Sequence, residues 1–206
     1  MGVTVLDHAI ARSIVTQLRD KNTPPEIFRA LARRISTILA VEAARGLSIT
    51  PLQVETPLEV TNGHQFTDGL VAVPILRAGL GMLDPVLELI PNTDVGYLGL
   101  ERNEMTAEAG LYYSKMPNVT GKTVWLLDPM LATGGSACSA ARVLYDLGAS
   151  ETTLICIVAA PEGIALLTRE YPLLKILTAS LDRELNDRKY ILPGLGDFGD
   201  RLFGTG

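Results

Sequence analysis

The sequence predicts an α/β fold in which a parallel sheet is flanked by helices. Three near-continuous apolar segments are typical of strands buried on both faces: LVAVPIL at 70–76, VWLL at 124–127 and TLICIVA at 153–159. Segments with the periodicity of helices lie between them, and strands that alternate with helices favour a parallel sheet covered on both sides. Ligands bind such sheets beyond the carboxyl ends of the strands, so a functional site is expected at that edge.

Length and composition indicate one globular domain spanning residues 1–206. The chain is 47% hydrophobic and 20% charged, and its formal net charge of −5 argues against a nucleic-acid partner. Cys138 and Cys156 are too few for a disulfide framework, which favours a reduced, cytoplasmic compartment. Asp7, His8 and Arg12 occupy the place of an apolar signal segment, and no apolar run approaches the roughly 18 residues of a membrane span. We therefore expect neither a signal peptide nor a membrane partner.

The first 46 residues are predicted to form a helical arm, suited to contact with a partner. An amphipathic helix within residues 1–22 should have one apolar face, formed by Ile10, Ile14, Val15 and Leu18. A second helix should begin with Thr23 as its N-cap, Pro24 at its first position and Glu26 completing a capping box. Its apolar stripe comprises Ile27, Leu31, Ile35, Ile38 and Leu39, and Gly46 should end it.

Strands, helices and two longer connections are predicted from residue 47 onward. Residues 47–69 indicate an irregular segment or a hairpin. The strand at 70–76 is followed by RAGLG at 77–81, a short helix through 85–90 and a strand at 94–100. The polar stretch 101–121 is long for a connection within a compact domain, which favours a functional loop or a protruding hairpin. Its Tyr112 and Tyr113 could close over a ligand or pack within that hairpin.

The stretch from Thr123 to Gly148 has the pattern of an anion-binding turn. A strand leads to Asp128, then to the small-residue loop ATGGS at 132–136, and then to a helix predicted from Val143, Leu144 and Leu147 that should stop at Gly148. A helix N-terminus directs backbone N–H groups at a phosphate, and absent side chains let it approach. An ionised Asp128 only accepts hydrogen bonds, which suits a pair of ribose hydroxyls. The alternative is a structural turn with an N-cap.

The remainder of the chain predicts the strand at 153–159, a helix from Pro161, a strand at 173–180 and a folded C-terminal flap at 186–206 that is rich in glycine and proline. Arg77, Arg102 and Asp128 each follow a predicted strand end, so the fold should bring them to one rim. His8 and His64 are not well placed to act as a general base, and each is expected to be a surface or structural residue.

DPMLATGGS at 128–136 resembles the phosphoribosyl-diphosphate loop of the type I phosphoribosyltransferases. Most members carry two adjacent acids, whereas Pro129 follows Asp128 here, as it does in the uracil-specific members. Further blocks agree with that branch of the family: PILRAGLGM at 74–82, RNE at 102–104, AAPEG at 159–163 and YILPGLGDFGDRLFGT at 190–205. The resemblance extends from about residue 70 to the end of the chain.

The resemblance implies pyrimidine salvage, in which uracil and 5-phospho-α-D-ribose 1-diphosphate give UMP and diphosphate. It implies diphosphate binding by Arg77 and Arg102, and catalytic roles for Asp128 and Arg102. The loop implied to bind the ribose 5-phosphate comprises Asp128, Pro129, Met130, Leu131, Ala132, Thr133, Gly134, Gly135 and Ser136. Asp197 would face the sugar diphosphate, and the implied uracil pocket comprises Ile191, Gly196, Asp197 and Phe198.

The family resemblance also implies Mg²⁺ bound mainly through the substrate diphosphate, no protein metal site, a homodimer or larger homo-oligomer, and GTP binding as in some relatives. The sequence departs from the family pattern at Glu101, where an aromatic residue is frequent, at Lys189, where glycine is frequent, and at Phe198, where alanine is frequent. Two alternatives stay open: a phosphoribosyltransferase for another base, and a non-catalytic ligand sensor or RNA-binding regulator that kept the fold.

Overall fold

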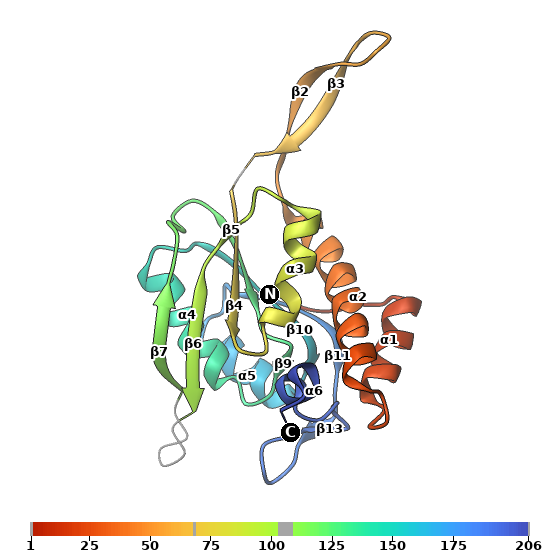
Figure 1. Ribbon diagram of the computed structural model, residues 1–206. Coiled ribbons are helices and arrows are strands. Elements are labelled where there is room, and N and C mark those ends of the chain that lie inside the picture. The colour runs from red at the N-terminus through yellow and green to blue at the C-terminus, as the bar shows by residue number, and fades with distance from the viewer. Residues whose placement is uncertain (1, 68, 103–108, 206) are drawn as a thin grey trace.

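A computed structural model describes residues 2–67, 69–102 and 109–205, and its centre is one predominantly parallel sheet (Figure 1). The main strands follow in the spatial order β1 (Val3–Val5), β11 (Lys175–Leu181), β10 (Glu151–Ala159), β8 (Thr123–Leu127), β4 (Leu70–Leu76), β6 (Tyr97–Arg102) and β7 (Ala109–Lys115). Within this sheet, β6 and β7 are the only described neighbours that pair antiparallel, while β5 (Asp94–Val95) joins β4 and β9 (Met130–Leu131) joins β10. The predicted α/β class with a parallel sheet is confirmed.

The register of the central strands aligns their carboxyl ends. Pro74 of β4 lies opposite Leu127, the last residue of β8, and Leu76 lies opposite Gly99 of β6. The residues that follow β4 and β8 therefore meet at one edge of the sheet. The strand expected at 94–100 is instead divided into β5 and β6, and β6 runs on to Arg102 because it pairs with β7. The sequence analysis placed Arg102 after the end of a strand. In the structure it is instead the last residue of β6.

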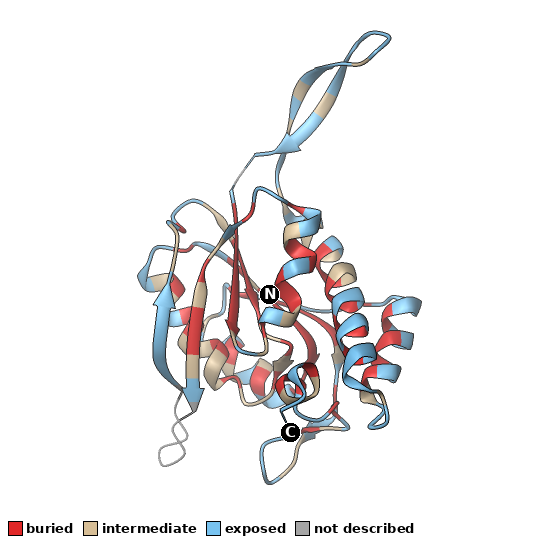
Figure 2. Cartoon of the chain, viewed as in Figure 1, coloured by how far each residue is buried: buried red, intermediate tan, exposed pale blue. Residues whose placement is uncertain are grey.

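Two apolar cores lie on the two faces of the sheet. The first packs α1 (Ala9–Arg19), α2 (Pro25–Ala43) and α3 (Leu80–Leu89) against side chains such as Trp125 and Leu127. The second packs α4 (Gly135–Asp146) and α5 (Pro161–Glu170) against Val124 and Leu126. Alternate residues of β8 thus serve opposite cores, which explains its unbroken apolar run. The buried residues in Figure 2 follow these layers.

A hairpin of β2 (Ile49–Glu55) and β3 (Val60–Phe66) projects from the body at the amino ends of the strands (Figure 1). Its register runs from the pair Ile49 and Phe66 to the pair Glu55 and Val60. Of the two alternatives for 47–69, the hairpin is confirmed, and most of its residues are exposed (Figure 2). The stretch from residue 101 also enters a hairpin, β6–β7, whose residues 103–108 lie outside the described part of the chain.

The N-terminal segment differs in detail from its prediction. Residues 3–5 form β1, an edge strand parallel to β11, and α1 starts only at Ala9. Ile10 is exposed, because α1 packs through Ala11, Ile14, Val15 and Leu18. Both helices contribute to the first core, so the segment predicted as an arm is part of the body of the molecule.

The start of α2 lies one residue later than predicted. Pro24 is its N-cap and Pro25 its first residue, and the Thr23 hydroxyl donates to the Gln17 carbonyl at 2.6 Å, so Thr23 does not cap the helix. Ile27 is exposed, whereas Leu31, Ile35 and Leu39 are fully buried as expected. A short 3₁₀ turn, Ala44–Gly46, follows α2.

Helix α4 buries small residues where larger ones were expected. Its buried face comprises Ala137, Ala140, Ala141 and Leu144, while Leu147 is exposed beyond the helix end. Gly148 has φ of +89°, a left-handed conformation that suits glycine and ends the helix as predicted. Strand β11 starts at Lys175, and Leu173, placed in that strand by the sequence, is exposed. Among the described residues, no helix is both long and apolar enough to span a membrane.

Candidate functional site

Asp128 stands at the carboxyl end of β8, half-buried behind the loop that leads to α4. Its backbone N–H donates to the Ile155 carbonyl at 3.2 Å, which fixes the residue to the end of the sheet. Its Oδ1 accepts the Met130 N–H at 3.3 Å. Burial raises the pKa of Asp128 from 3.8 to about 6, and the bond from Met130 only partly opposes this shift. A carboxyl group whose charged form is disfavoured by burial to this extent is a candidate functional residue.

The loop from Asp128 to α4 forms a small concave surface of about 70 Å³ lined by backbone and short side chains. Gly134 is the N-cap of α4 and has φ of +85°, so a residue with a side chain would be strained there. The Thr133 hydroxyl oxygen accepts the Gly135 N–H at 3.4 Å. The first N–H groups of a helix lack partners within it. The turn thus offers these groups, with the Thr133 and Ser136 hydroxyls, to an anion.

The back of this loop rests on the first turn of α5, a contact that the sequence analysis missed. A Cβ at Gly163 would overlap the Ala132 carbonyl oxygen and lie 3.0 Å from Leu131 Cγ. A Cβ at Gly134 would in turn lie 3.0 Å from the Gly163 oxygen. In the sequence, Gly163 stands out only as the last residue of the AAPEG block at 159–163. A glycine in the first turn of a helix was the signal that could have indicated close packing there.

Glu162 connects the same turn of α5 to the C-terminal segment. Its Oε1 accepts the Leu185 N–H at 2.9 Å, and this bond lowers the pKa of the exposed Glu162 carboxyl. Leu185 belongs to β12 (Glu184–Leu185), which pairs with β13 (Ile191–Leu192). The start of α5 therefore supports the loop on one side and the C-terminal flap on the other.

Arg77 lies in the turn between β4 and α3, directly against the end of β8. A Cβ at Gly79 in that turn would overlap the Leu127 carbonyl oxygen, so the two strand ends are in close contact. The Arg77 side chain is 61% exposed and leans toward the flap. Its Nη2 is 3.9 Å from Asp200 Oδ1, and its guanidinium carbon is 5.8 Å from the centre of the Phe203 ring. An exposed, long pair of this kind is weak, so Arg77 is free to bind a ligand.

Arg102 is described by its backbone alone, at the end of β6 and opposite Ala109 of β7. Asn103 and Glu104 of the RNE block lie outside the described residues. Tyr112 packs its ring over Gly99, where a Cβ would lie 2.5 Å from Tyr112 Cζ. Of the two alternatives for this tyrosine, packing within the hairpin is the one that the structure displays.

The flap and the loop share one cavity of about 430 Å³. Met130 and Ala132 line it from the loop, and residues 188–197 line it from the flap, among them Ile191, Gly196 and Asp197 of the predicted uracil pocket. Phe198 does not line the cavity. Its side chain is fully buried, with its ring 5.2 Å from that of Phe28, and it anchors α6 (Phe198–Phe203) to α2.

Asp197 has a structural task in addition to its position in the cavity. Its Oδ1 accepts the Asp200 N–H at 2.9 Å and caps α6. Asp197 is also exposed and lines the shared cavity. His8 likewise caps α1 by accepting the N–H groups of Ile10 and Ala11, which confirms it as a structural residue.

The described residues include no group of three or more His, Cys, Asp or Glu side chains that could hold a metal ion. Cys156 is buried beneath the site, and burial raises the pKa of its thiol to about 12. Burial also raises the pKa of the partly buried Cys138 on α4. Both thiols therefore serve as packing groups at neutral pH.

Comparison with known proteins agrees with this geometry. The family model for uracil phosphoribosyltransferase matches residues 5–205. A uracil phosphoribosyltransferase of Fervidobacterium nodosum is 48% identical over 203 residues, covering 98% of each chain, and one of Paenarthrobacter aurescens is 46% identical over 209 residues, covering 100% of this chain and 99% of the other.

Solved structures agree as well. A protein from Aquifex aeolicus aligns with a TM-score of 0.94 at 36% identity, covering 98% of both chains. A hypoxanthine-guanine phosphoribosyltransferase from Bacillus anthracis shares the fold, with a TM-score of 0.53 at 12% identity over 77% of this chain and 80% of that one. The near-complete match to the family model, together with relatives of such identity, leads to one conclusion: the chain belongs to the uracil phosphoribosyltransferase family.

Proposed function

We propose that the protein transfers the 5-phosphoribosyl group of 5-phospho-α-D-ribose 1-diphosphate to uracil, giving UMP and diphosphate. The bond between C1 of the ribose and the diphosphate oxygen breaks, a bond from C1 to the N1 nitrogen of uracil forms, and that nitrogen loses its proton. The observation that carries the proposal is the cavity shared by the loop and the flap, because it joins an anion-binding turn to a pocket for a second substrate.

The loop residues 128–136 are proposed to hold the ribose 5-phosphate. The N–H groups at the start of α4 and the Thr133 and Ser136 hydroxyls supply donors for the phosphate oxygens. Asp128 is proposed to accept hydrogen bonds from the ribose hydroxyls. Its pKa of about 6 leaves it mostly ionised at pH 7, as that role needs.

Arg77 and Arg102 are proposed to bind the diphosphate. As the bond at C1 breaks, positive charge develops on the ribose ring and negative charge on the leaving diphosphate. A guanidinium can bind phosphate oxygens bidentately and stabilise that charge, and the carboxylate of Asp128 lies on the sugar side. The weak contact of Arg77 with Asp200 at 3.9 Å allows the side chain to exchange partners when the diphosphate binds.

Mg²⁺ is proposed to bind mainly through the diphosphate oxygens. Asp128 is the only carboxylate among the residues that line the loop surface, and the described residues supply no cage for an ion. This fits Mg²⁺, which commonly binds substrate phosphates with few protein ligands. When bound, the ion would offset the charge of the leaving diphosphate.

The flap is proposed to recognise uracil through its backbone around Ile191 and Gly196–Phe198. Uracil presents a planar edge of alternating donors and acceptors that backbone N–H and C=O groups can match. Cytosine would leave some of these groups unpaired, which supports discrimination between the two bases. Neither histidine lies at this site, since His8 caps α1 and His64 belongs to β3, so the N1 proton is proposed to pass to solvent or to a nearby acid.

Three further properties are part of the proposal. We expect a cytoplasmic protein, GTP binding, and a homodimer or larger homo-oligomer. Exposed apolar side chains on the projecting hairpin support self-association: Ile49, Val54, Leu58, Val60 and Phe66. Adding GTP to the activity assay tests the second property.

The proposed reaction is tested by incubating the protein with Mg²⁺, phosphoribosyl diphosphate and single bases, while following both diphosphate release and nucleotide formation. We expect turnover with uracil and little with cytosine, adenine or orotate. No turnover with uracil would contradict the proposal, and turnover with adenine or orotate alone would assign the protein to another base.

A further inference from the structure

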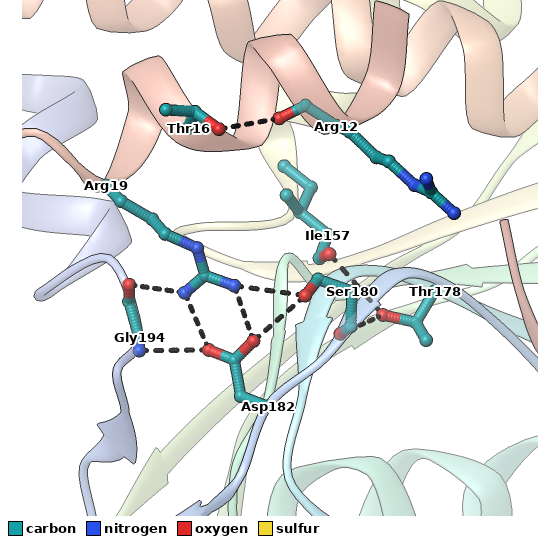
Figure 3. A network of polar contacts seen from close by, with 8 residues as sticks. All are labelled: Arg12, Thr16, Arg19, Ile157, Thr178, Ser180, Asp182 and Gly194. Carbon is teal, nitrogen blue, oxygen red and sulfur yellow. Dashed lines mark hydrogen bonds and ion pairs between the residues drawn. The ribbon is translucent and has the colours of Figure 1, made fainter. Parts of the chain in front are cut away.

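Behind the flap lies an ion pair between the partly buried Arg19 of α1 and the buried Asp182, just after β11 (Figure 3). The Arg19 fork donates to both carboxylate oxygens, from Nη1 to Oδ2 at 2.8 Å and from Nη2 to Oδ1 at 2.5 Å. Ser180 Oγ accepts from Arg19 Nη2 and donates to Asp182 Oδ1, each at 3.0 Å. Neither charged residue lines the cavity shared by the loop and the flap.

The pair holds both polar backbone groups of Gly194. The Gly194 N–H donates to Asp182 Oδ2 at 2.9 Å, and its carbonyl accepts from Arg19 Nη1 at 2.7 Å (Figure 3). The turn is tight, because Gly194 has φ of +62° and a Cβ there would overlap the Ile191 carbonyl oxygen. Gly194 lies midway between Ile191 and Asp197, so its peptide sets the path of the backbone across the proposed uracil pocket.

A second arginine, Arg201, also links the flap to α1. Arg201 of α6 donates from Nη1 to the Leu195 carbonyl at 2.7 Å, and it also donates to the carbonyls of Leu18 and Asp20 at the end of α1. Consecutive carbonyls of the flap, those of Gly194 and Leu195, are therefore each held by an arginine. Arg19 belongs to α1 itself, and Arg201 of α6 donates to carbonyls at the end of α1.

The state of the pair suits a fixed support. Asp182 is only 5% exposed, and its burial acts to raise its pKa. The bonds and charge of Arg19, with the bonds from Gly194 and Ser180, outweigh burial and leave the pKa of the Asp182 carboxyl below its usual value. The carboxylate is thus charged at neutral pH. Ion pairs removed from water often add little to the stability of a protein. Their better documented role is to favour one conformation of the chain over others.

We propose that Arg19 and Asp182 are positioning residues for base binding, which act by fixing the Gly194 peptide and through it the backbone that receives uracil. The assignment rests on the proposed function, in which residues 191–198 bind the base. Arg19 and Asp182 line neither the shared cavity nor the loop surface, so their loss should weaken uracil binding while leaving the loop and its proposed sugar-phosphate contacts in place.

The test compares Arg19→Lys, which keeps the charge but loses the fork, with Arg12→Lys on the same helix. Arg12 is a matched control because it forms an exposed ion pair with Asp7, and its side chain points away from Arg19 and Asp182 in Figure 3. We expect Arg19→Lys to raise the KM for uracil about tenfold, the effect of losing about one charged hydrogen bond, with the KM for the sugar diphosphate changed less than about twofold. Arg12→Lys should match the wild type in both.

A double variant, Arg19→Met with Asp182→Leu, separates positioning from simple stability, because it removes both charges of the pair together and leaves neither without its partner. We expect its melting temperature to stay near that of the wild type while its KM for uracil remains raised. A wild-type KM for uracil in Arg19→Lys and in the double variant, or an equal rise in KM for both substrates, would overturn the assignment. A wild-type protein without uracil turnover would instead overturn the proposed function.

Discussion

At Asp128 the proposed function and the stability of the fold are opposed. Its pKa is 3.8 when unburied and about 6 in the fold, so the folded state binds more protons between those values. Stability therefore falls as pH rises from about 4 to about 6 and stays reduced above it, by up to about 3 kcal/mol for a shift of about two pKa units. Asparagine at this position carries no charge to bury.

We predict that Asp128→Asn abolishes most turnover and yet raises the melting temperature at pH 7. The gain should shrink to a small remainder near pH 4, where the wild-type carboxyl is protonated in the folded state and already partly protonated in the unfolded state. Thermal unfolding of both proteins between pH 4 and pH 8, together with kcat at pH 7.5, measures both effects. An exposed aspartate, Asp187, supplies the control variant Asp187→Asn. Wild-type kinetics in Asp128→Asn would remove the carboxylate from the sugar site.

Lys189 is the only described non-glycine residue with a positive φ, at 67°. It lies in a turn in which the Asn186 side chain accepts the N–H groups of Arg188 and Tyr190 at 3.0 and 2.9 Å. The left-handed conformation costs a residue with a side chain about 1 kcal/mol. Lys189 thus carries a conformational cost in the flap.

We predict that Lys189→Gly stabilises the protein by up to about 1 kcal/mol, with part of the gain offset by the greater freedom of glycine in the unfolded chain. Lys189→Asn should also stabilise it, since asparagine tolerates this conformation. Chemical denaturation measures both. The neighbouring Arg188→Gly is the matched control and should lower stability by about 0.5 kcal/mol. A loss of stability in both Lys189 variants would contradict the strain at this residue.

At the scale of elements, the candidate site depends on how closely α5 approaches the loop at residues 128–136. Alanine is favoured over glycine within a helix by about 1 kcal/mol. At Gly163 the added Cβ would nevertheless overlap the Ala132 carbonyl oxygen. We predict that Gly163→Ala lowers stability by about 1–3 kcal/mol and raises the KM for phosphoribosyl diphosphate, because the loop must shift.

Denaturation and initial-rate kinetics test this contact. Gly46→Ala is the matched control, since a Cβ at Gly46 has no neighbour within 4 Å. It should leave both stability and KM near the wild-type values. A Gly163→Ala protein that gains stability, as helix propensity alone would give, would show that the loop does not rest on α5 as described.

Much of this arrangement could be predicted because its signals are local. The apolar runs of β4, β8 and β10 and the small-residue loop after Asp128 each carry their own pattern. The edge strand Val3–Val5 is too short for any periodicity, and its pairing with Ile176–Thr178 is visible only in the fold. Ile10 and Leu147 are exposed because the body of the molecule packs against other positions of their segments. The spacing of apolar residues alone does not indicate which of these positions will face the core.

The supporting contacts of the site could not be predicted for a related reason. Arg19 and Asp182 are 163 residues apart in the chain, and nothing near either residue indicates its partner. Gly163 and Ala132 likewise meet only because β9 pairs with β10 and turns the loop toward α5. Family motifs identify the groups that we propose to face the ligand, whereas the side chains behind them are defined by packing.

For the whole molecule, the fold separates two surfaces. The candidate site lies at the carboxyl ends of the strands with α6, and the β2–β3 hairpin projects at the opposite, amino end (Figure 1). No residue of β2 or β3 belongs to either apolar core. Leu58 at the hairpin tip is 94% exposed, and Val60 is 60% exposed. Apolar groups presented this way on an element without core contacts are typical of an association surface.

We predict that the protein forms a homodimer or larger assembly through this hairpin, and that Leu58→Asp with Val60→Asp lowers its mass in solution. Charges at these positions would have to lose water on association, whereas they cost the isolated fold little because both side chains are exposed. Light scattering after size-exclusion chromatography measures the mass, and circular dichroism checks the fold. Leu173→Asp, at a residue 78% exposed elsewhere, is the control and should keep the wild-type mass. An unchanged mass in the hairpin variant, or the same loss in the control, would show that association does not depend on the hairpin.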